Sequence, residues 1–287
     1  MTKRRVLVTG CKGLLGTALT RILSQEYEVI PCDIDTADVT DLDSFGEFAR
    51  NASPDIIVHC AGYTRVDDAE KEKELAFKIN AFGTKNVATV ATEMEAPVLY
   101  VSTDYVFDGR KGAPYLEFDR PNPINVYGSS KLAGEDFVRN ICPQNWIVRT
   151  SWLYGTGGKN FVDTMVTLSG KGKEIPVVDD QRGSPTLADD LAGAMMVILK
   201  RNEFGLYHAT NGGDCSWYEF AREIVSLWGG DAAIVKPISS AQSDRPAKRP
   251  TNSVLENYRL RHTLGFETRH WRDALKDYLR AKKEEGS

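Results

Sequence analysis

The chain has 287 residues, of which 41% are hydrophobic and 26% are charged, and both fractions are close to the averages of soluble globular proteins. This length allows one large domain, or a large domain with a smaller lobe, whose core needs neither disulfides nor a metal. The net charge of -4 and the scattered Lys and Arg residues argue against nucleic-acid binding, and we expect neither a nucleic acid nor a membrane as partner.

The cysteines form an odd set without a Cys-x-x-Cys pair, so we expect reduced and mostly buried thiols. They are Cys11, Cys32, Cys60, Cys142 and Cys215. The N-terminal apolar run, residues 6–8, is too short for the central region of a secretory signal. We therefore expect a cytoplasmic protein with a small-molecule partner.

Short β-branched runs alternate with amphipathic stretches through the first half of the chain. The predicted strands are residues 5–8, 27–31, 55–60, 98–102 and 146–150, and the predicted helices are residues 14–24, 42–51, 72–95 and 129–140. Parallel strands need crossover connections, so this alternation predicts an α/β fold with a doubly wound parallel sheet. Ligands of such sheets bind beyond the carboxyl ends of the strands.

Glycine and proline become frequent from about Tyr154, where we predict the start of a smaller mixed α/β lobe. We expect residues 1–153 to bind a dinucleotide, residues 186–210 to return to that domain, and residues 154–185 and 211–287 to form a substrate-binding lobe. Helices are predicted after Thr186 and after Ser216, because each hydroxyl has a carboxylate three residues on. Residues 206–209 are predicted to add one strand.

A glycine turn follows the first strand and leads into a helix. Gly10, Gly13 and Gly16 have the spacing that brings a backbone close to a pyrophosphate at a helix N-terminus, although a glycine turn without a ligand is the alternative. Asp33, about twenty residues further on, would accept hydrogen bonds from ribose hydroxyls and favours NAD over NADP. Lys12 leaves that choice open, so the expected cofactor is NADPH or NADH.

Other residues around these motifs are expected to contact the cofactor. They are Leu14, Leu15, Asp38, Val39, Cys60, Ala61, Gly62, Tyr63 and Asn80, together with Lys12.

Tyr127 and Lys131 are four residues apart, which puts them on one face of a predicted helix. A free tyrosine titrates near pH ~10, and a neighbouring positive charge lowers that pKa. An exposed helical pair is the alternative, but the strand at residues 98–102 ends beside Thr103 at the same sheet edge. Thr103 could donate a hydrogen bond to a carbonyl substrate while Tyr127 delivers the proton.

Seven blocks of the sequence, in order, resemble the extended short-chain dehydrogenases/reductases and, within that family, the dTDP-4-dehydrorhamnose reductases. The blocks are residues 9–16, 61–70, 102–107, 125–135, 149–154, 180–186 and 249–253, and the resemblance covers nearly the whole chain. It implies hydride transfer from the nicotinamide to C4 of a dTDP-linked 4-keto-6-deoxy-L-hexose, giving dTDP-L-rhamnose. Tyr127 would be the acid, Lys131 would hold the nicotinamide ribose and lower the tyrosine pKa, and Thr103 would bond the carbonyl.

The resemblance also implies a set of substrate contacts. Asp104, Tyr105 and Trp152 would line the sugar pocket, and core packing is an equal alternative for Trp152. Arg249 and Asn252 would lie toward the nucleotide diphosphate, which an arginine can bond through two oxygens at once.

Some relatives are described as dimers around a magnesium ion held by acidic side chains. The position where such an acid is expected, two residues after the third glycine, is Ala18. We therefore expect no metal there, and either a monomer or a homodimer.

Two other functions are compatible with parts of this pattern. A nucleotide-sugar epimerase or dehydratase shares the fold and the Tyr-Lys pair, but related dehydratases resemble Thr-Asp-Glu where this chain has Tyr105. A non-catalytic regulatory subunit of methionine adenosyltransferase would keep the cofactor site. The presence of Thr103, Tyr127 and Lys131 together favours the reductase.

Overall fold

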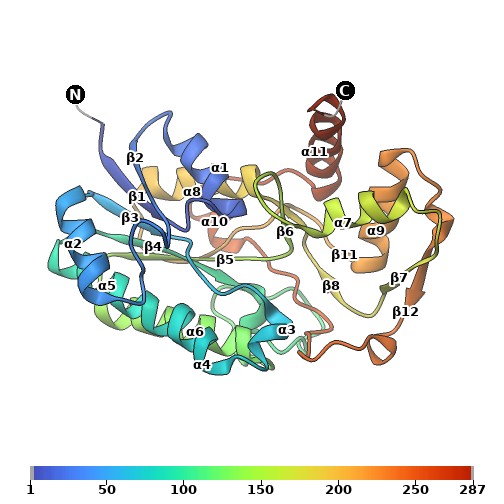
Figure 1. Cartoon of the computed structure of the whole chain (residues 1–287), viewed down its shortest axis with the longest axis horizontal. Helices are drawn as coiled ribbons and strands as arrows, with labels where there is room; N and C mark the ends of the chain where they lie inside the picture. The colour runs from blue at the N-terminus through green and yellow to red at the C-terminus, as the bar shows by residue number, and fades with distance from the viewer. Residues whose placement is uncertain (1–2, 286–287) are drawn as a thin grey trace.

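A six-stranded parallel sheet is the centre of the larger part of this computed structural model, which describes residues 3–285 (Figure 1). Its order is β10-β5-β4-β3-β1-β2. The strands are β1 (Arg5–Thr9), β2 (Glu28–Cys32), β3 (Ile56–His59), β4 (Val98–Thr103), β5 (Asn145–Thr150) and β10 (Gly205–His208). The predicted strands and the doubly wound parallel sheet are thus confirmed.

Helices cover both faces of this sheet because its strands are apolar on both sides. Val6 and Val8 of β1 pack with α1 (Leu14–Leu23) and α8 (Ala188–Arg201), whereas Leu7 points to the opposite face, toward α2 (Leu42–Ala52) and α5 (Thr84–Glu93). Helix α6 (Val126–Ile141) lies beside α5 on this second face (Figure 1). The inner strands of the sheet are therefore buried, and a ligand can reach them only at their ends.

The predicted helix over residues 72–95 is interrupted in the structure. It consists of α4 (Lys73–Phe77), a π-helical segment η1 (Lys78–Gly83) and α5. Side chains at helical spacing do not reveal where a turn widens, because a π-segment shifts the periodicity within a single turn. The sequence pattern therefore predicted one continuous helix.

The two predicted helix starts in the second half differ in outcome. The Ser216 capping box is confirmed: its hydroxyl accepts from the Glu219 N–H at 3.1 Å, and the Glu219 carboxylate accepts from the Ser216 N–H at 2.8 Å. The Thr186 cap is wrong, because α8 begins after Leu187 without a side-chain cap. The Thr186 hydroxyl instead donates to the Ser184 carbonyl at 3.2 Å.

The smaller lobe stands on the right of Figure 1 and has its own apolar core. Helices α7 (Phe161–Ser169), α9 (Trp217–Trp228) and α11 (Trp271–Glu285) pack with the parallel pair β7 (Ile175–Val178) and β12 (Val235–Ile238). Short pairs β6 (Leu153–Tyr154) with β9 (Thr186–Leu187), and β8 (Arg182–Gly183) with β11 (Cys215–Ser216), connect these elements. The exact boundaries of the two units stay a prediction.

Short helical segments complete the described elements. They are α3 (Val66–Ala69), η2 (Asp104–Val106), η3 (Ala232–Ile234), η4 (Ser240–Gln242) and α10 (Tyr258–His262). All five cysteines are unpaired, and Cys32, Cys142 and Cys215 are buried, so the prediction of mostly buried thiols is confirmed and their reduced state stays a prediction. Within residues 3–285 no helix combines the length and the apolar character that a membrane span requires.

Candidate active site

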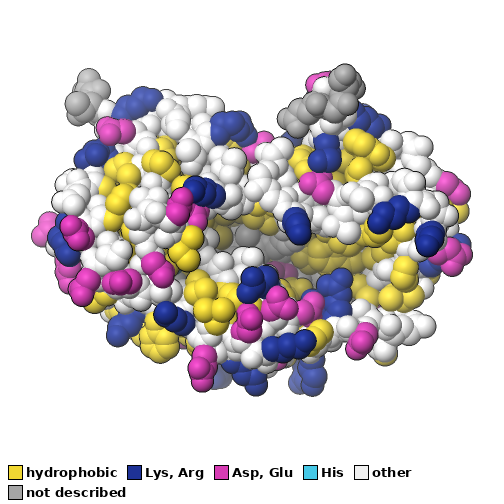
Figure 2. Space-filling view, viewed as in Figure 1, with side chains coloured by type: hydrophobic (Ala, Val, Ile, Leu, Met, Phe, Trp, Pro, Cys, Tyr) yellow, Lys and Arg dark blue, Asp and Glu magenta, His cyan; other side chains and the backbone are white. Residues whose placement is uncertain are grey.

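A crevice with a cavity volume of about 720 Å³ lies beyond the carboxyl ends of β1, β3, β4 and β5, and the molecule is visibly hollowed near the middle of the face in Figure 2. Sixteen of the predicted site residues line it. They are Gly10, Gly13, Leu14, Leu15, Asp33, Asp38, Val39, Cys60, Ala61, Gly62, Thr103, Asp104, Tyr105, Tyr127, Lys131 and Trp152.

The glycine turn has the shape that its spacing predicted. Gly10 has φ 65°, a left-handed conformation that glycine adopts without strain, and its carbonyl accepts from the Gly13 N–H at 3.0 Å. A Cβ on Gly16 would lie 2.1 Å from the Gly10 carbonyl oxygen, so only glycine lets α1 approach the turn. Gly13 precedes α1 and provides no side-chain cap. The helix therefore offers backbone N–H groups and a partial positive charge to an anion.

Asp33 is anchored at the rim of the crevice beside the glycine turn. One oxygen of its carboxylate accepts from the Lys12 N–H and the other from the Ile34 N–H, each at 2.9 Å. The ammonium of Lys12 is bonded to Asp35 instead. A carboxylate fixed in this way would accept from ribose hydroxyls and repel a 2′-phosphate.

Asp33→Ala is therefore expected to raise the ratio of kcat/KM for NADPH to that for NADH about tenfold, equivalent to ~1.4 kcal/mol. Steady-state rates with each cofactor measure this ratio. Asp35→Ala is the matched control, because it releases Lys12 but keeps the Asp33 carboxylate. An Asp33→Ala ratio equal to that of the wild type would contradict the ribose role.

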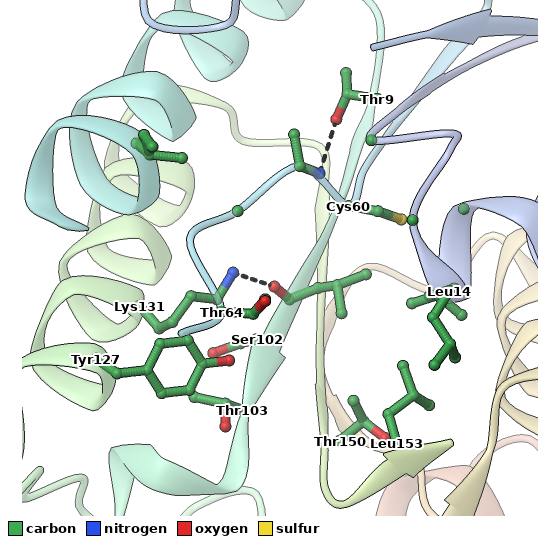
Figure 3. A pocket seen from close by; sticks show the side chains of 18 of the residues that line it. Thr9, Leu14, Cys60, Thr64, Ser102, Thr103, Tyr127, Lys131, Thr150 and Leu153 are labelled. Atoms are coloured by element: carbon green, nitrogen blue, oxygen red, sulfur yellow. Dashed lines mark hydrogen bonds between the residues drawn. The ribbon is translucent and has the colours of Figure 1, made fainter. Parts of the chain in front are cut away.

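Tyr127 and Lys131 both project from α6 into the crevice (Figure 3). The helix begins beside them because Asn125 caps it, accepting from the Gly128 N–H at 2.7 Å. The Lys131 ammonium donates to the Val101 carbonyl at 2.6 Å. The predicted helical pair is thus at the end of β4, on the same edge of the sheet as the glycine turn.

Burial has the largest effect on the pKa of Tyr127 and on that of Lys131. Loss of water raises the pKa of Tyr127 to about 12, against a lowering by the Thr103 hydrogen bond, and burial lowers the pKa of Lys131 to about 7. The expected lowering of the tyrosine pKa is therefore wrong for this structure, because removal from water raises the pKa and the only opposing effect comes from the Thr103 hydrogen bond, not from Lys131. At neutral pH the phenol keeps its proton and can donate it.

Lys131→Met tests this burial through the pH dependence of stability. An unfolded lysine titrates near pH ~10.4, so between pH ~7 and that value the unfolded chain binds a proton that the folded chain does not. The free energy of unfolding of the wild type should therefore rise relative to that of the Met variant from pH ~7 to ~9.5. Urea unfolding of both proteins measures the difference; a constant difference across this range would contradict the lowered pKa.

Thr103 is the last residue of β4 and lies beside Tyr127 (Figure 3), and Asp104 is the first residue of η2. The Thr103 hydroxyl donates to the Asp104 carboxylate at 3.0 Å and accepts from the Tyr105 N–H at 3.2 Å. Burial raises the pKa of Asp104 to about 7. These groups bring hydrogen-bond donors and acceptors to the point where a substrate carbonyl would meet Tyr127.

Five predicted site residues are not among those that line the crevice. Arg249 donates to both oxygens of Asp67, at 3.0 and 2.8 Å, and Asn252 donates to the Ala113 carbonyl at 3.3 Å. Asn80 lies behind the wall, where it bonds both backbone groups of Tyr63 and the Ser130 hydroxyl. Tyr63 itself is also outside the lining, and Lys12 is exposed and bonded to Asp35. Contacts of these five residues with a cofactor or substrate stay predictions.

The sequence pattern missed several lining residues. Thr150 and Ser151 follow β5 at the same edge and could have been found by the argument used for β4, because carboxyl ends of parallel strands lie together. Lys159, Phe161 and Trp217 come from the lobe, and no local signal marks them. The remaining lining residues outside the predicted set are Thr9, Gly16, Cys32, Ile34, Ala37, Thr40, Thr64, Val66, Ile79, Val101, Ser102 and Leu153.

Trp152 is partly packed and partly exposed to the crevice, so its contact with the substrate stays a prediction. Its indole lines the crevice and at the same time stacks on Trp217. In the described residues, no group of three or more His, Cys, Asp and Glu side chains is placed to hold a metal ion.

Comparison with known proteins gives consistent matches along the chain. The family model described as RmlD substrate binding domain matches residues 4–284. The spore coat polysaccharide biosynthesis protein SpsK of Bacillus subtilis is 42% identical over 97% of each chain. A dTDP-4-dehydrorhamnose reductase of Sinorhizobium fredii is 39% identical over 95% of each chain.

Solved structures lead to the same family. A dTDP-4-dehydrorhamnose reductase from Bacillus anthracis, in complex with NADP, is 41% identical with a TM-score of 0.95, over 98% of this chain and 100% of that one. A dTDP-glucose 4,6-dehydratase from Streptomyces venezuelae at 21% identity and a UDP-glucose 4-epimerase from Thermus thermophilus at 19% identity share the fold. The chain belongs to the RmlD family, that of the dTDP-4-dehydrorhamnose reductases.

Proposed function

We propose that this protein is an NAD(P)H-dependent reductase of the C4 keto group of a nucleotide-linked 4-keto-6-deoxy sugar, converting dTDP-4-dehydro-L-rhamnose to dTDP-L-rhamnose. The observation that carries the proposal is the arrangement of Tyr127 and Lys131 in one crevice with the glycine turn. Its family, whose relatives include several named dTDP-4-dehydrorhamnose reductases, supports the substrate.

The residues present fit a dinucleotide. The open N-terminus of α1 suits a pyrophosphate, and a Cβ at Gly10, 2.7 Å from the Ala61 nitrogen, would close the turn that admits it. When bound, the reduced nicotinamide supplies the hydride. Gly10, Gly13 and Leu14 would hold the phosphates, and Asp33 the adenosine ribose.

The chain's own contribution is to position the carbonyl and to supply one proton. Tyr127 donates its phenolic proton to the C4 oxygen as that oxygen gains negative charge. The Thr103 hydroxyl, turned from Asp104 to the substrate, would donate a hydrogen bond to the same oxygen and so stabilise the charge before the proton arrives. Lys131 would hold the nicotinamide ribose close to the phenol. One hydride and one proton together convert the ketone to the alcohol.

The proposal is tested with purified protein, NADPH or NADH, and a panel of nucleotide 4-keto sugars. Absorbance of the reduced nicotinamide should fall fastest with dTDP-4-dehydro-L-rhamnose, and product analysis should identify dTDP-L-rhamnose. The panel includes dTDP-4-keto-6-deoxy-D-glucose, because a relative named as its reductase is 37% identical. No absorbance loss with either cofactor would refute the reductase function and leave a non-catalytic role.

We further propose that the protein acts in the cytoplasm, as a monomer or homodimer. Five free thiols support a reducing compartment, where cysteines are kept unpaired. Light scattering after size exclusion decides between the two oligomeric states.

A further inference from the structure

Two tryptophans from different parts of the molecule stack in the wall of the crevice. The ring centroids of Trp152 and Trp217 are 3.6 Å apart and the rings are inclined by only 9°. Trp152 follows β5 of the large sheet, whereas Trp217 is the first residue of α9 in the lobe. The stack therefore joins the lobe to the strand end beside the candidate catalytic groups.

Trp152 is held in an unusual conformation. Its φ of 47° is rare for a bulky residue and persists only where surrounding contacts enforce it. A Cβ on Gly183 would lie 2.4 Å from Cε2 of the Trp152 indole, so the backbone of β8 approaches the ring as closely as only glycine permits. Trp217 covers one face of this indole, and the Gly183 backbone packs closely against the ring at Cε2, so both neighbours limit the movement of the indole.

The lobe fixes Trp217 independently of Trp152. The capping box of Ser216 and Glu219 defines the start of α9, and Arg182 bonds Glu219 at 3.3 Å. The Phe161 ring lies 4.5 Å from that of Trp217 on the lobe side. The lobe therefore holds Trp217 in place, and Trp217 in turn supports the Trp152 indole.

Partial exposure distinguishes this pair from tryptophans of the core. Trp146 and Trp271 have no exposed surface, whereas Trp152 and Trp217 are half-buried and line the crevice. Phe161 and Leu153 also line the crevice. This wall is made of aromatic rings and a leucine side chain, so it suits the apolar side of a ligand, because an unpaired hydroxyl against it would lose its hydrogen bonds to water.

We propose that Trp217 is a positioning residue that holds the Trp152 indole in the crevice wall, in the orientation in which that indole would contact the sugar of the substrate. The proposal rests on the proposed function, since it concerns how that substrate is oriented. Trp217 acts through Trp152 and thereby sets the affinity for the sugar, with little influence on hydride or proton transfer.

Trp217→Ala should raise the KM for the sugar nucleotide about tenfold, because an aromatic contact of good geometry contributes an affinity of about this size. The kcat should change less than about threefold. The Kd for NADPH, measured by fluorescence titration, should stay unchanged. Trp217→Phe keeps a stacking ring and should restore KM to within about threefold of the wild type. Trp228→Phe, at the other end of α9 and not among the crevice residues, is the matched control and should keep the wild-type KM.

A binding experiment separates sugar positioning from nucleotide binding. The wild type should bind dTDP-L-rhamnose more tightly than dTDP, and Trp217→Ala should lose most of this difference while its affinity for dTDP is kept. Gly183→Ala, which displaces the Trp152 indole from the other side, should have the same effect and replaces Trp217→Ala if that variant fails to fold.

Absence of turnover by the wild type would refute the proposed function, and that assay is read first. If the wild type is active, Trp217→Ala is compared with it. The positioning role would be overturned if the variant kept both the wild-type KM and the wild-type ratio of dTDP-L-rhamnose affinity to dTDP affinity. Parallel losses for NADPH, dTDP and dTDP-L-rhamnose would also overturn it, because they would indicate a loosened fold.

Discussion

Tyr127→Phe is expected to lower kcat about 10²- to 10⁴-fold, the range for loss of a positioned general acid, while the Kd for NADPH stays within about twofold. The substitution removes only the hydroxyl and keeps the ring that packs edge-on against Tyr105 at 5.9 Å. Because burial raises the pKa of Tyr127 to about 12, the phenol is the protonated donor that reduction of a ketone needs. Single-turnover rates with preformed NADPH complex measure the effect directly.

Tyr115→Phe provides the matched control for this substitution. Tyr115 is also buried, but its hydroxyl donates to Asp108 at 2.9 Å and it does not line the crevice. This control should lose some stability and keep its turnover. If Tyr127→Phe retained more than about a tenth of wild-type kcat, the proton would have to come from another group.

Glu135→Ala should have the largest effect on stability, lowering the free energy of unfolding by about 3–5 kcal/mol. Glu135 on α6 and Arg149 on β5 are both buried, and two N–H groups of the guanidinium donate to the carboxylate at 2.7 Å each. The Ser102 hydroxyl donates to the same carboxylate at 2.6 Å. Removing the acid leaves a buried arginine without its counter-charge, and urea unfolding measures the loss.

Two comparisons isolate the ion pair. Asp136→Ala removes the next acid along α6, which is exposed and pairs only with Arg139, so its cost should stay below about 1 kcal/mol. The double substitution Glu135→Met with Arg149→Met should cost much less than Glu135→Ala, because no unpaired charge remains. A Glu135→Ala cost no larger than that of Asp136→Ala would contradict the role of this pair in holding α6 against the sheet.

The fold class followed from local patterns in the sequence. Residues 6–8 and 98–101 are apolar because both faces of their strands are covered, and such continuous runs predict parallel strands without further information. Gly10 and Gly16 could also be recognised from the local sequence. A tight turn and a close helix approach each exclude a side chain at a defined position, so glycine marks both positions.

The candidate site was only partly accessible from the sequence. Tyr127 and Lys131 are one helical turn apart, so their common direction is a local property that spacing predicts. The π-helical segment that carries Asn80 and the pairing of Arg249 with Asp67 were not predicted. The first depends on a single widened turn, and the second joins residues that are distant along the chain.

The sequence by itself determined the sheet, the glycine turn and the direction of the Tyr-Lys pair, because these depend on residues within a few positions of one another. The tertiary structure decided the rest: the tyrosine pKa rises because packing removes water from the phenol, and the Trp152–Trp217 stack forms because the lobe folds back onto the end of β5. Exclusion of solvent and contact between distant segments arise only when the whole chain has folded, so no local pattern of residues encodes them.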